Sequence, residues 1–104
     1  MRYRAEWQVL LDDRILEIAA EADGPLDAMD FNDQINAEYN TDHVRRRCNK
    51  LVDEGLLKRT HPRHAAYVIT DEGRAYLEGA YDVAAGAYRA ENNGNTDTGT
   101  SEEV

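Results

Sequence analysis

Apolar residues near the start of the chain recur at helical spacing and predict its first helix. The set comprises Leu10, Leu11, Ile15, Leu16, Ile18 and Ala19. Asp12 or Asp13 can act as the N-cap, and the run from Asp23 to Pro25 cannot continue a helix. We therefore predict a helix of about ten residues that ends near Ala22.

A second, shorter helix is predicted from Asp30 to Glu38, because Phe31 and Ile35 are spaced to share one face. Asp27 is an alternative N-cap, so the start of this helix stays open between the two aspartates. Tyr39 and Asn40 then form a tight turn before the next element.

The third helix is predicted from Asp42 to about Glu54, with Thr41 as its N-cap and Gly55 as a left-handed C-cap. Because a helix turns by about 100° per residue, this segment has two unlike sides. One side is apolar and contains Val44, Cys48, Leu51 and Val52. The other side centres on Arg46, surrounded by Asp42, His43, Asn49, Lys50 and Asp53, with Arg45 and Arg47 at its flanks. We expect the apolar side to pack on the first two helices.

Residues 56–60 and 65–70 are two short runs typical of strands, and the polar segment from His61 to His64 separates them. This pattern predicts a hairpin with a basic tip. Thr70 then caps a last helix, which begins at Asp71 and is predicted to end near Arg89. One stripe of that helix would hold Leu77, Tyr81, Ala84 and Tyr88.

The order helix, helix, tight turn, helix, hairpin, helix is that of a winged helix-turn-helix. We therefore predict an α+β, mostly helical domain over residues 1–90, with a two-stranded wing and an extra C-terminal helix for dimerisation. Residues 91–104 are polar and acidic and cannot repay the entropy of ordering, so a disordered tail is expected there. In this fold the helix after the turn enters the major groove of DNA.

Length and composition exclude several classes of protein. A chain of 104 residues has room for one domain, and a single cysteine excludes an internal disulfide. No apolar run approaches the roughly 18 residues of a membrane span, and no signal-peptide core follows Met1, so we expect a cytoplasmic protein. Glycine-rich phosphate loops, nucleophile elbows and metalloprotease motifs do not occur, so we expect neither an enzyme nor a cofactor.

Charge is distributed unevenly along the chain. The net charge is -9, which ordinarily argues against nucleic acid because like charges repel. Residues 42–63, however, hold seven basic residues against three acidic ones, for a net charge of +4, while the rest of the chain carries -13. A charge run is usually just a solvated face. Here the run coincides with the third helix and the wing, so we interpret it as a DNA-binding surface.

Donor geometry assigns roles within that surface. A guanidinium can donate two hydrogen bonds to guanine O6 and N7, and an Asn amide can pair with adenine N6 and N7. Arg46 and Asn49 are therefore the predicted base readers. The remaining predicted contacts bind the DNA phosphates, or either a base or a phosphate. They are Thr41, Asp42, His43, Arg45, Arg47 and Lys50 on the helix, and Lys58, Arg59, Arg63 and His64 on the wing.

Two residue types invite other interpretations. His61 and His64 are spaced as a metal could use them, but no cysteine or carboxylate cluster accompanies them, so no metal site is expected. Cys48 on the apolar side is interpreted as a packing residue rather than a redox switch.

Several segments resemble a known family. They include Val44–Cys48 with the sequence Val-Arg-Arg-Arg-Cys, Gly-Leu-Leu at 55–57 and Thr-Asp-Glu-Gly at 70–73. From about Trp7 to Asp82 the chain resembles the MarR-like, haloarchaeal winged helix-turn-helix regulators similar to the phage phi-H repressor. That resemblance implies a small DNA-binding transcriptional regulator of the repressor type. A halophilic source also fits abundant Asp and Glu beside only two lysines.

The apolar surface of the predicted last helix indicates how the protein assembles. The last helix has more apolar surface than one small core needs, so we expect a homodimer on double-stranded DNA, with an interface formed by Trp7, Leu77, Tyr81, Ala84 and Tyr88. The alternative function is a winged-helix module that binds protein within a transcription complex. The sequence indicates no effector, operator or membrane partner.

Overall fold

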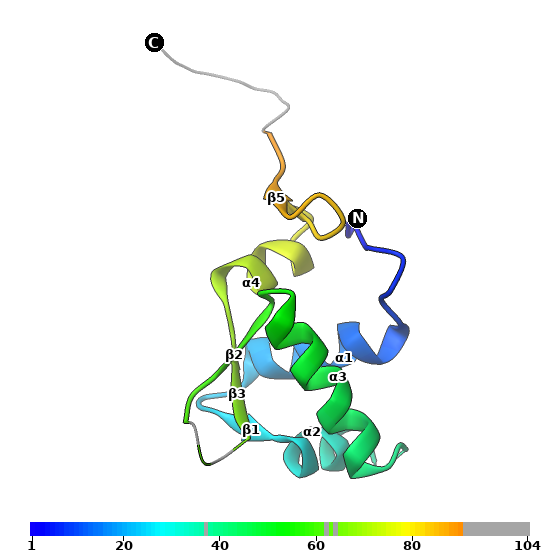
Figure 1. Cartoon of the computed structure of the whole chain (residues 1–104), viewed down its shortest axis with the longest axis vertical. Coiled ribbons are helices and arrows are strands. Elements are labelled where there is room, and N and C mark those ends of the chain that lie inside the picture. Colours follow the sequence, from blue (N-terminus) through cyan, green and yellow to red (C-terminus); the bar gives the residue numbers. More distant parts are fainter. Residues whose placement is uncertain (37, 62, 64, 91–104) are drawn as a thin grey trace.

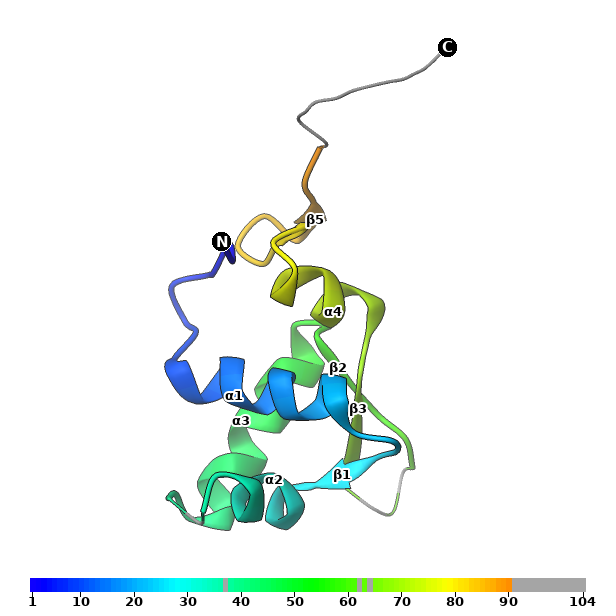
Figure 2. The same cartoon turned by 180° about the vertical axis from the view of Figure 1, so that it is seen from behind.

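The computed structural model describes residues 1–36, 38–61, 63 and 65–90. Its core lies between α1 (Leu10–Glu21), α2 (Ala28–Gln34), α3 (Thr41–Asp53) and a small antiparallel sheet. Figure 1 shows α3 crossing in front of α1, with α2 below them and the sheet at one side. Figure 2, from behind, places α1 in front of α3. The predicted α+β winged helix-turn-helix fold is confirmed.

The sheet contains β1 (Leu26–Asp27), β2 (Leu57–Arg59) and β3 (Ala66–Ile69), in the order β1-β3-β2. The hairpin of β2 and β3 is the predicted wing, and Leu57 pairs with Ile69 at its base. β1 was not predicted, because two residues are too short to show an alternating pattern. This strand pairs Leu26 with Tyr67 and so ties the entry of α2 to the wing.

Helix starts differ from the predicted ones by one to four residues, because the N-cap residues differ. α1 begins at Leu10, so neither Asp12 nor Asp13 is its N-cap; Asp12 sits inside the first turn, where its Oδ2 accepts from the Val9 N–H at 2.9 Å. α3 begins at Thr41 rather than after it, because Asn40 Oδ1 accepts from the His43 N–H at 2.7 Å.

The second helix is shorter than predicted and begins earlier. Asp27, the alternative cap, is the N-cap, and its Oδ1 accepts from the Asp30 N–H at 2.8 Å. The helix ends at Gln34 rather than Glu38, because Asn36 adopts a left-handed φ of 61°. Asn32 then holds the turn toward α3, since its Nδ2 donates to the Tyr39 carbonyl at 2.6 Å.

The predicted last helix, to Arg89, is wrong in its extent. α4 spans Asp71–Leu77 behind the predicted Thr70 cap, and a hairpin of β4 (Tyr81–Asp82) and β5 (Ala87–Tyr88) follows it. Gly79, at φ 81°, ends α4 with bonds from the Gly79 N–H to Tyr76 O at 3.0 Å and from the Ala80 N–H to Ala75 O at 2.8 Å. The predicted left-handed Gly55, also at φ 81°, is confirmed.

The hairpin joins the two ends of the described chain. Val83 N–H donates to the Tyr3 carbonyl at 3.1 Å, and Tyr3 bridges to Asp82. Both views place the N-terminus and β5 beside each other, beyond α4 and away from α2 (Figures 1 and 2). The predicted disordered tail, 91–104, lies outside the described residues.

Gly79→Ala is expected to lower the free energy of unfolding by about 1–2 kcal/mol. A Cβ at this left-handed position would lie 2.5 Å from the backbone oxygen of Met1, so the N-terminal segment would have to move. Urea denaturation measures the change. Gly24→Ala is the matched control, because a Cβ there meets nothing within 4 Å. Equal stability of the two variants would show that Gly79 does not hold this helix end.

Candidate nucleic-acid interface

The two sides of α3 are as predicted. Val44, Cys48 and Leu51 are fully buried against the core, while Arg45, Arg46 and Asn49 are exposed. Within the described residues, Arg46 forms no hydrogen bond, ion pair or ring contact. Because its guanidinium keeps all five N–H donors, Arg46 can engage a ligand without breaking an internal contact.

Side chains in the first turn of α3 already form contacts within the protein. Arg45 Nη1 forms an ion pair with the exposed Asp42 carboxylate one turn earlier. The half-buried His43 has its ring 5.6 Å from that of Tyr39, and Thr41 is also half-buried. A phosphate would therefore meet Asp42 as well as Arg45, so this turn is a weaker anion site than its arginine alone suggests.

Arg47 turns away from the predicted phosphate-contacting flank and into the protein. Its Nε donates to Asp12 Oδ1 at 2.9 Å, and its Nη2 donates to Asp12 Oδ2 at 2.7 Å and to the Trp7 carbonyl at 3.2 Å. Asp12 is fully buried, and the hydrogen bond to its carboxylate raises the pKa of Arg47. The predicted phosphate contact is therefore not supported, because this guanidinium already has a buried partner.

Lys50 also lies on the side of α3 that faces the N-terminal segment. Its Nζ is 3.1 Å from Glu54 Oε2 and 4.9 Å from the centre of the Trp7 ring. The predicted contact of Lys50 with DNA would have to compete with both of these interactions.

Asn49 connects α3 to β3, the central strand of the sheet. The Tyr67 hydroxyl donates to Asn49 Oδ1 at 2.7 Å, and Tyr67 is only 1% exposed. Sequence patterns gave no sign of this partner, since the two residues lie 18 positions apart on different elements.

The wing presents three exposed cations from the predicted set. They are Lys58, Arg59 and Arg63, and their side chains have no hydrogen bond or ion pair within the described residues. His61 Nδ1 accepts from the Arg63 backbone N–H at 3.1 Å, which shapes the tip. The predicted contact of His64 lies outside the described residues.

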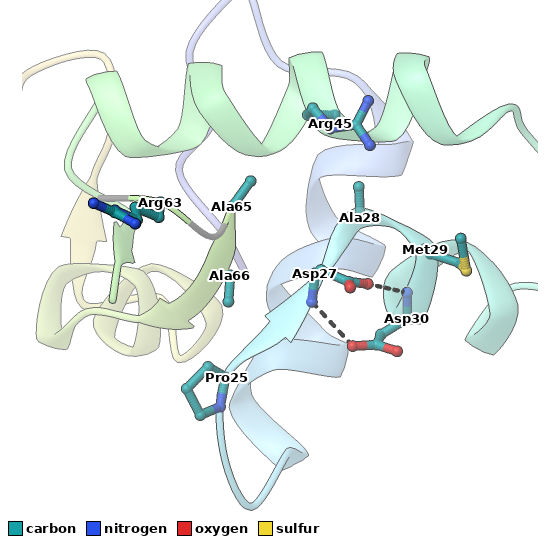
Figure 3. Close-up of a pocket in the computed structure, with 9 residues that line it drawn as sticks. All are labelled: Pro25, Asp27, Ala28, Met29, Asp30, Arg45, Arg63, Ala65 and Ala66. Atoms are coloured by element: carbon teal, nitrogen blue, oxygen red, sulfur yellow. Dashed lines mark hydrogen bonds between the residues drawn. The ribbon is translucent and has the colours of Figure 1, made fainter. Parts of the chain in front are cut away.

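A cavity of about 490 Å³ lies between α3, the wing and the start of α2. Its lining includes Arg45 of α3 and Arg63 of the wing, and Figure 3 shows Asp27 and Asp30 on the side of α2. At the first turn of α2, each of these two carboxylates accepts a hydrogen bond from the backbone N–H of the other residue. The cavity thus has mixed charge and does not form an anion site by itself.

Cys48 is fully buried, and burial raises the pKa of its thiol to about 12. We therefore expect iodoacetamide to modify native protein at pH 8 far more slowly than urea-unfolded protein, because the thiolate is the nucleophile. Mass spectrometry after timed quenching measures both rates. Equal rates would contradict the interpretation of Cys48 as a packing residue.

The predicted dimer residues do not share one helical stripe, because the chain leaves the helix at Leu77. Tyr81 is buried and meets Tyr88 across the hairpin, with ring centres 5.1 Å apart. Ala84 lies exposed in the hairpin turn, and Trp7 is half-buried beside α3. Among the described residues, no helix is long and apolar enough to cross a membrane, and no cluster of three metal-ligating side chains occurs.

Comparison with known proteins agrees with this geometry. A family model for the winged helix-turn-helix phage repressor matches residues 1–85. The repressor protein of Halobacterium phage phiH is 33% identical over 87 residues, which cover 80% of this chain and 93% of that protein. The crystal structure of the PhiH1 repressor-like protein from Haloarcula marismortui matches with a TM-score of 0.78 and 38% identity, covering 86% of this chain and 98% of that one.

Both relatives come from haloarchaeal sources, as the acidic composition led us to expect. The family consists of DNA-binding regulators rather than enzymes. With most of its length matched by the family model, the chain belongs to the winged helix-turn-helix phage repressors.

Proposed function

We propose that this protein is a sequence-specific repressor that reads the major groove with α3 and follows the DNA backbone with its wing. One observation carries the proposal: Arg46 stands exposed and unpaired within the described residues, opposite the side of α3 that the core buries. A guanidinium in that position can donate to guanine O6 and N7. The exposed wing cations Lys58, Arg59 and Arg63 can bind phosphate.

Selection from a random library of DNA duplexes in high KCl tests the proposal. Enrichment of one sequence by the full chain, and its loss in Arg46→Ala, would support it. The absence of enrichment over a range of salt concentrations would contradict it. Such a result would favour the alternative, a winged-helix module that binds protein.

We also propose that the protein acts as a homodimer on two half-sites about one DNA turn apart. Apolar side chains remain exposed at the start of α1 and on the C-terminal hairpin, where Leu10 is 75% and Tyr88 55% exposed. Trp7 precedes the start of α1 in the chain. Light scattering at micromolar concentration in high salt is expected to give twice the chain mass, and a monomer mass would end this proposal.

The salt dependence of the affinity for a specific site is expected to come from the three wing cations. At 1 M salt the Debye length is about 3 Å, so affinity must come from short-range contacts. With Arg47 and Arg45 engaged internally and Arg46 on a base, the three wing cations remain for phosphate. We expect a log-log salt slope of about -3 for each protomer, since each neutralised phosphate contributes about -0.9.

Fluorescence anisotropy across a KCl series measures this slope. Lys58→Ala is expected to reduce its magnitude by about one without changing the preferred sequence. A slope much steeper than about -3 for each protomer would contradict the prediction, because phosphate contacts beyond the three wing cations would then contribute to the affinity.

A further inference from the structure

The hydrogen bond between Tyr67 and Asn49 joins the central strand of the sheet to the exposed side of α3. Tyr67 lies on β3, paired with Leu26 of β1 and Arg59 of β2, and only its hydroxyl reaches the edge of the interface. The ring is buried, so the hydroxyl position is set by the fold rather than by solvent. Tyr67 is therefore a hydrogen-bond partner in a fixed position for Asn49.

The direction of this hydrogen bond follows because the buried Tyr67 hydroxyl requires an acceptor. A buried Tyr O–H is costly to leave without an acceptor. Within the described residues, Asn49 Oδ1 at 2.7 Å is the acceptor that the Tyr67 hydroxyl has. With the amide turned the other way, its N–H would donate to the phenol oxygen and the phenol proton would lose that acceptor. Burial also raises the pKa of Tyr67, which keeps the hydroxyl protonated and able to donate.

We propose that Tyr67 is a positioning residue that fixes the Asn49 amide with its oxygen inward, so that Asn49 offers DNA its two N–H donors and selects guanine over adenine. This inference rests on the proposed function. Two hydrogen bonds to adenine would require the same oxygen to face the adenine N6 amino group. Guanine offers the acceptors N7 and O6 at that edge, which match a donor pair.

The surroundings of Asn49 favour the same choice. Arg45 and Arg59 lie close enough to the Tyr67 hydroxyl to act on its pKa, where both oppose the larger effect of burial. Both arginine side chains are exposed and contribute only N–H donors to this part of the surface. Beside these two arginines an adenine amino group would add another donor, whereas a guanine edge supplies the acceptors N7 and O6.

Selection from the random library with four proteins tests the inference: the full wild-type chain, Asn49→Ala, Tyr67→Phe and Tyr76→Phe. Tyr76 is the matched control, because it is equally buried and its hydroxyl donates to Asp13 Oδ1 at 2.6 Å, away from α3. At the base pair whose preference Asn49→Ala erases, wild type should prefer guanine over adenine by about tenfold. Tyr67→Phe should reduce that preference severalfold or shift it toward adenine, and Tyr76→Phe should leave it unchanged.

A second readout needs no DNA. In ¹H–¹⁵N spectra of the free protein, the side-chain amide signals that vanish in Asn49→Ala should shift in Tyr67→Phe and stay in place in Tyr76→Phe. An adenine preference in wild type, or an unchanged guanine preference or unchanged Asn49 signals in Tyr67→Phe, would overturn the inference while leaving the proposed function intact. A failure of every protein to enrich any sequence would instead overturn both.

Discussion

Arg47→Ala is expected to lower the free energy of unfolding by about 3 kcal/mol, although Arg47 lies in the middle of the basic helix that we propose to read DNA. Its partner Asp12 is fully buried, and both carboxylate oxygens accept from the guanidinium, at 2.9 and 2.7 Å. Asp12 Oδ2 also accepts from the Val9 N–H at the start of α1. Removing Arg47 leaves a buried carboxylate without its cation, which costs more than the ion pair itself contributes.

Urea denaturation in high KCl measures this loss, and Arg46→Ala is the control from the adjacent position. Arg46 is exposed and without a partner in the described residues, so its removal should change stability by less than about 0.5 kcal/mol. Equal stability of Arg46→Ala and Arg47→Ala would contradict the structural role of Arg47.

The chemistry of the pair permits a further check. Arg47→Lys keeps the charge but cannot reproduce the two-pronged contact with Asp12, so its stability should fall between wild type and Arg47→Ala. The double variant Asp12→Asn with Arg47→Met should lose less than the sum of the two single changes, because neither partner is then left as a lone buried charge. Additive losses would show that the two side chains do not stabilise each other.

The parts of this fold that the sequence predicts are those set by nearby residues. The two sides of α3 follow from its period, and Thr70 and Gly55 mark helix ends through local capping geometry. The signal that ends α4 was also present in Gly79. It was outweighed by Tyr81, Ala84 and Tyr88, whose spacing fits a helical stripe as well as it fits a short hairpin.

What the sequence could not show depends on partners far along the chain. Arg45 and Arg47 occupy equivalent flanks of α3, yet Arg47 has a buried carboxylate 35 residues away and Arg45 has an exposed one a single turn away. No local pattern distinguishes the two arginines, because an aspartate near a helix start, such as Asp12, is usually exposed and gives no sign of a buried partner. The partnership of Asn49 with Tyr67 is hidden for the same reason. The site residues that pattern analysis missed are thus the ones that orient α3.

Arg46→Ala is expected to reduce affinity for the selected DNA sequence by about tenfold for each half-site, and so by about 100-fold for a homodimer. Arg46 is the residue at the centre of the exposed side of α3 whose donors are all available within the described residues. Losing two hydrogen bonds to a guanine removes contacts that only the correct base supplies. Affinity for unrelated DNA should fall much less, because that binding rests on phosphate contacts.

Anisotropy titrations with the selected duplex and with a scrambled duplex measure both quantities at one salt concentration. Lys58→Ala is the matched control from the wing: it should weaken binding to the two duplexes by similar factors, since a phosphate contact does not depend on sequence. Arg46→Lys should restore the charge but little of the specificity, because an ammonium is a point charge without the planar fork of a guanidinium. Equal losses on both duplexes in Arg46→Ala would show that Arg46 binds the backbone and that another residue of α3 reads the sequence.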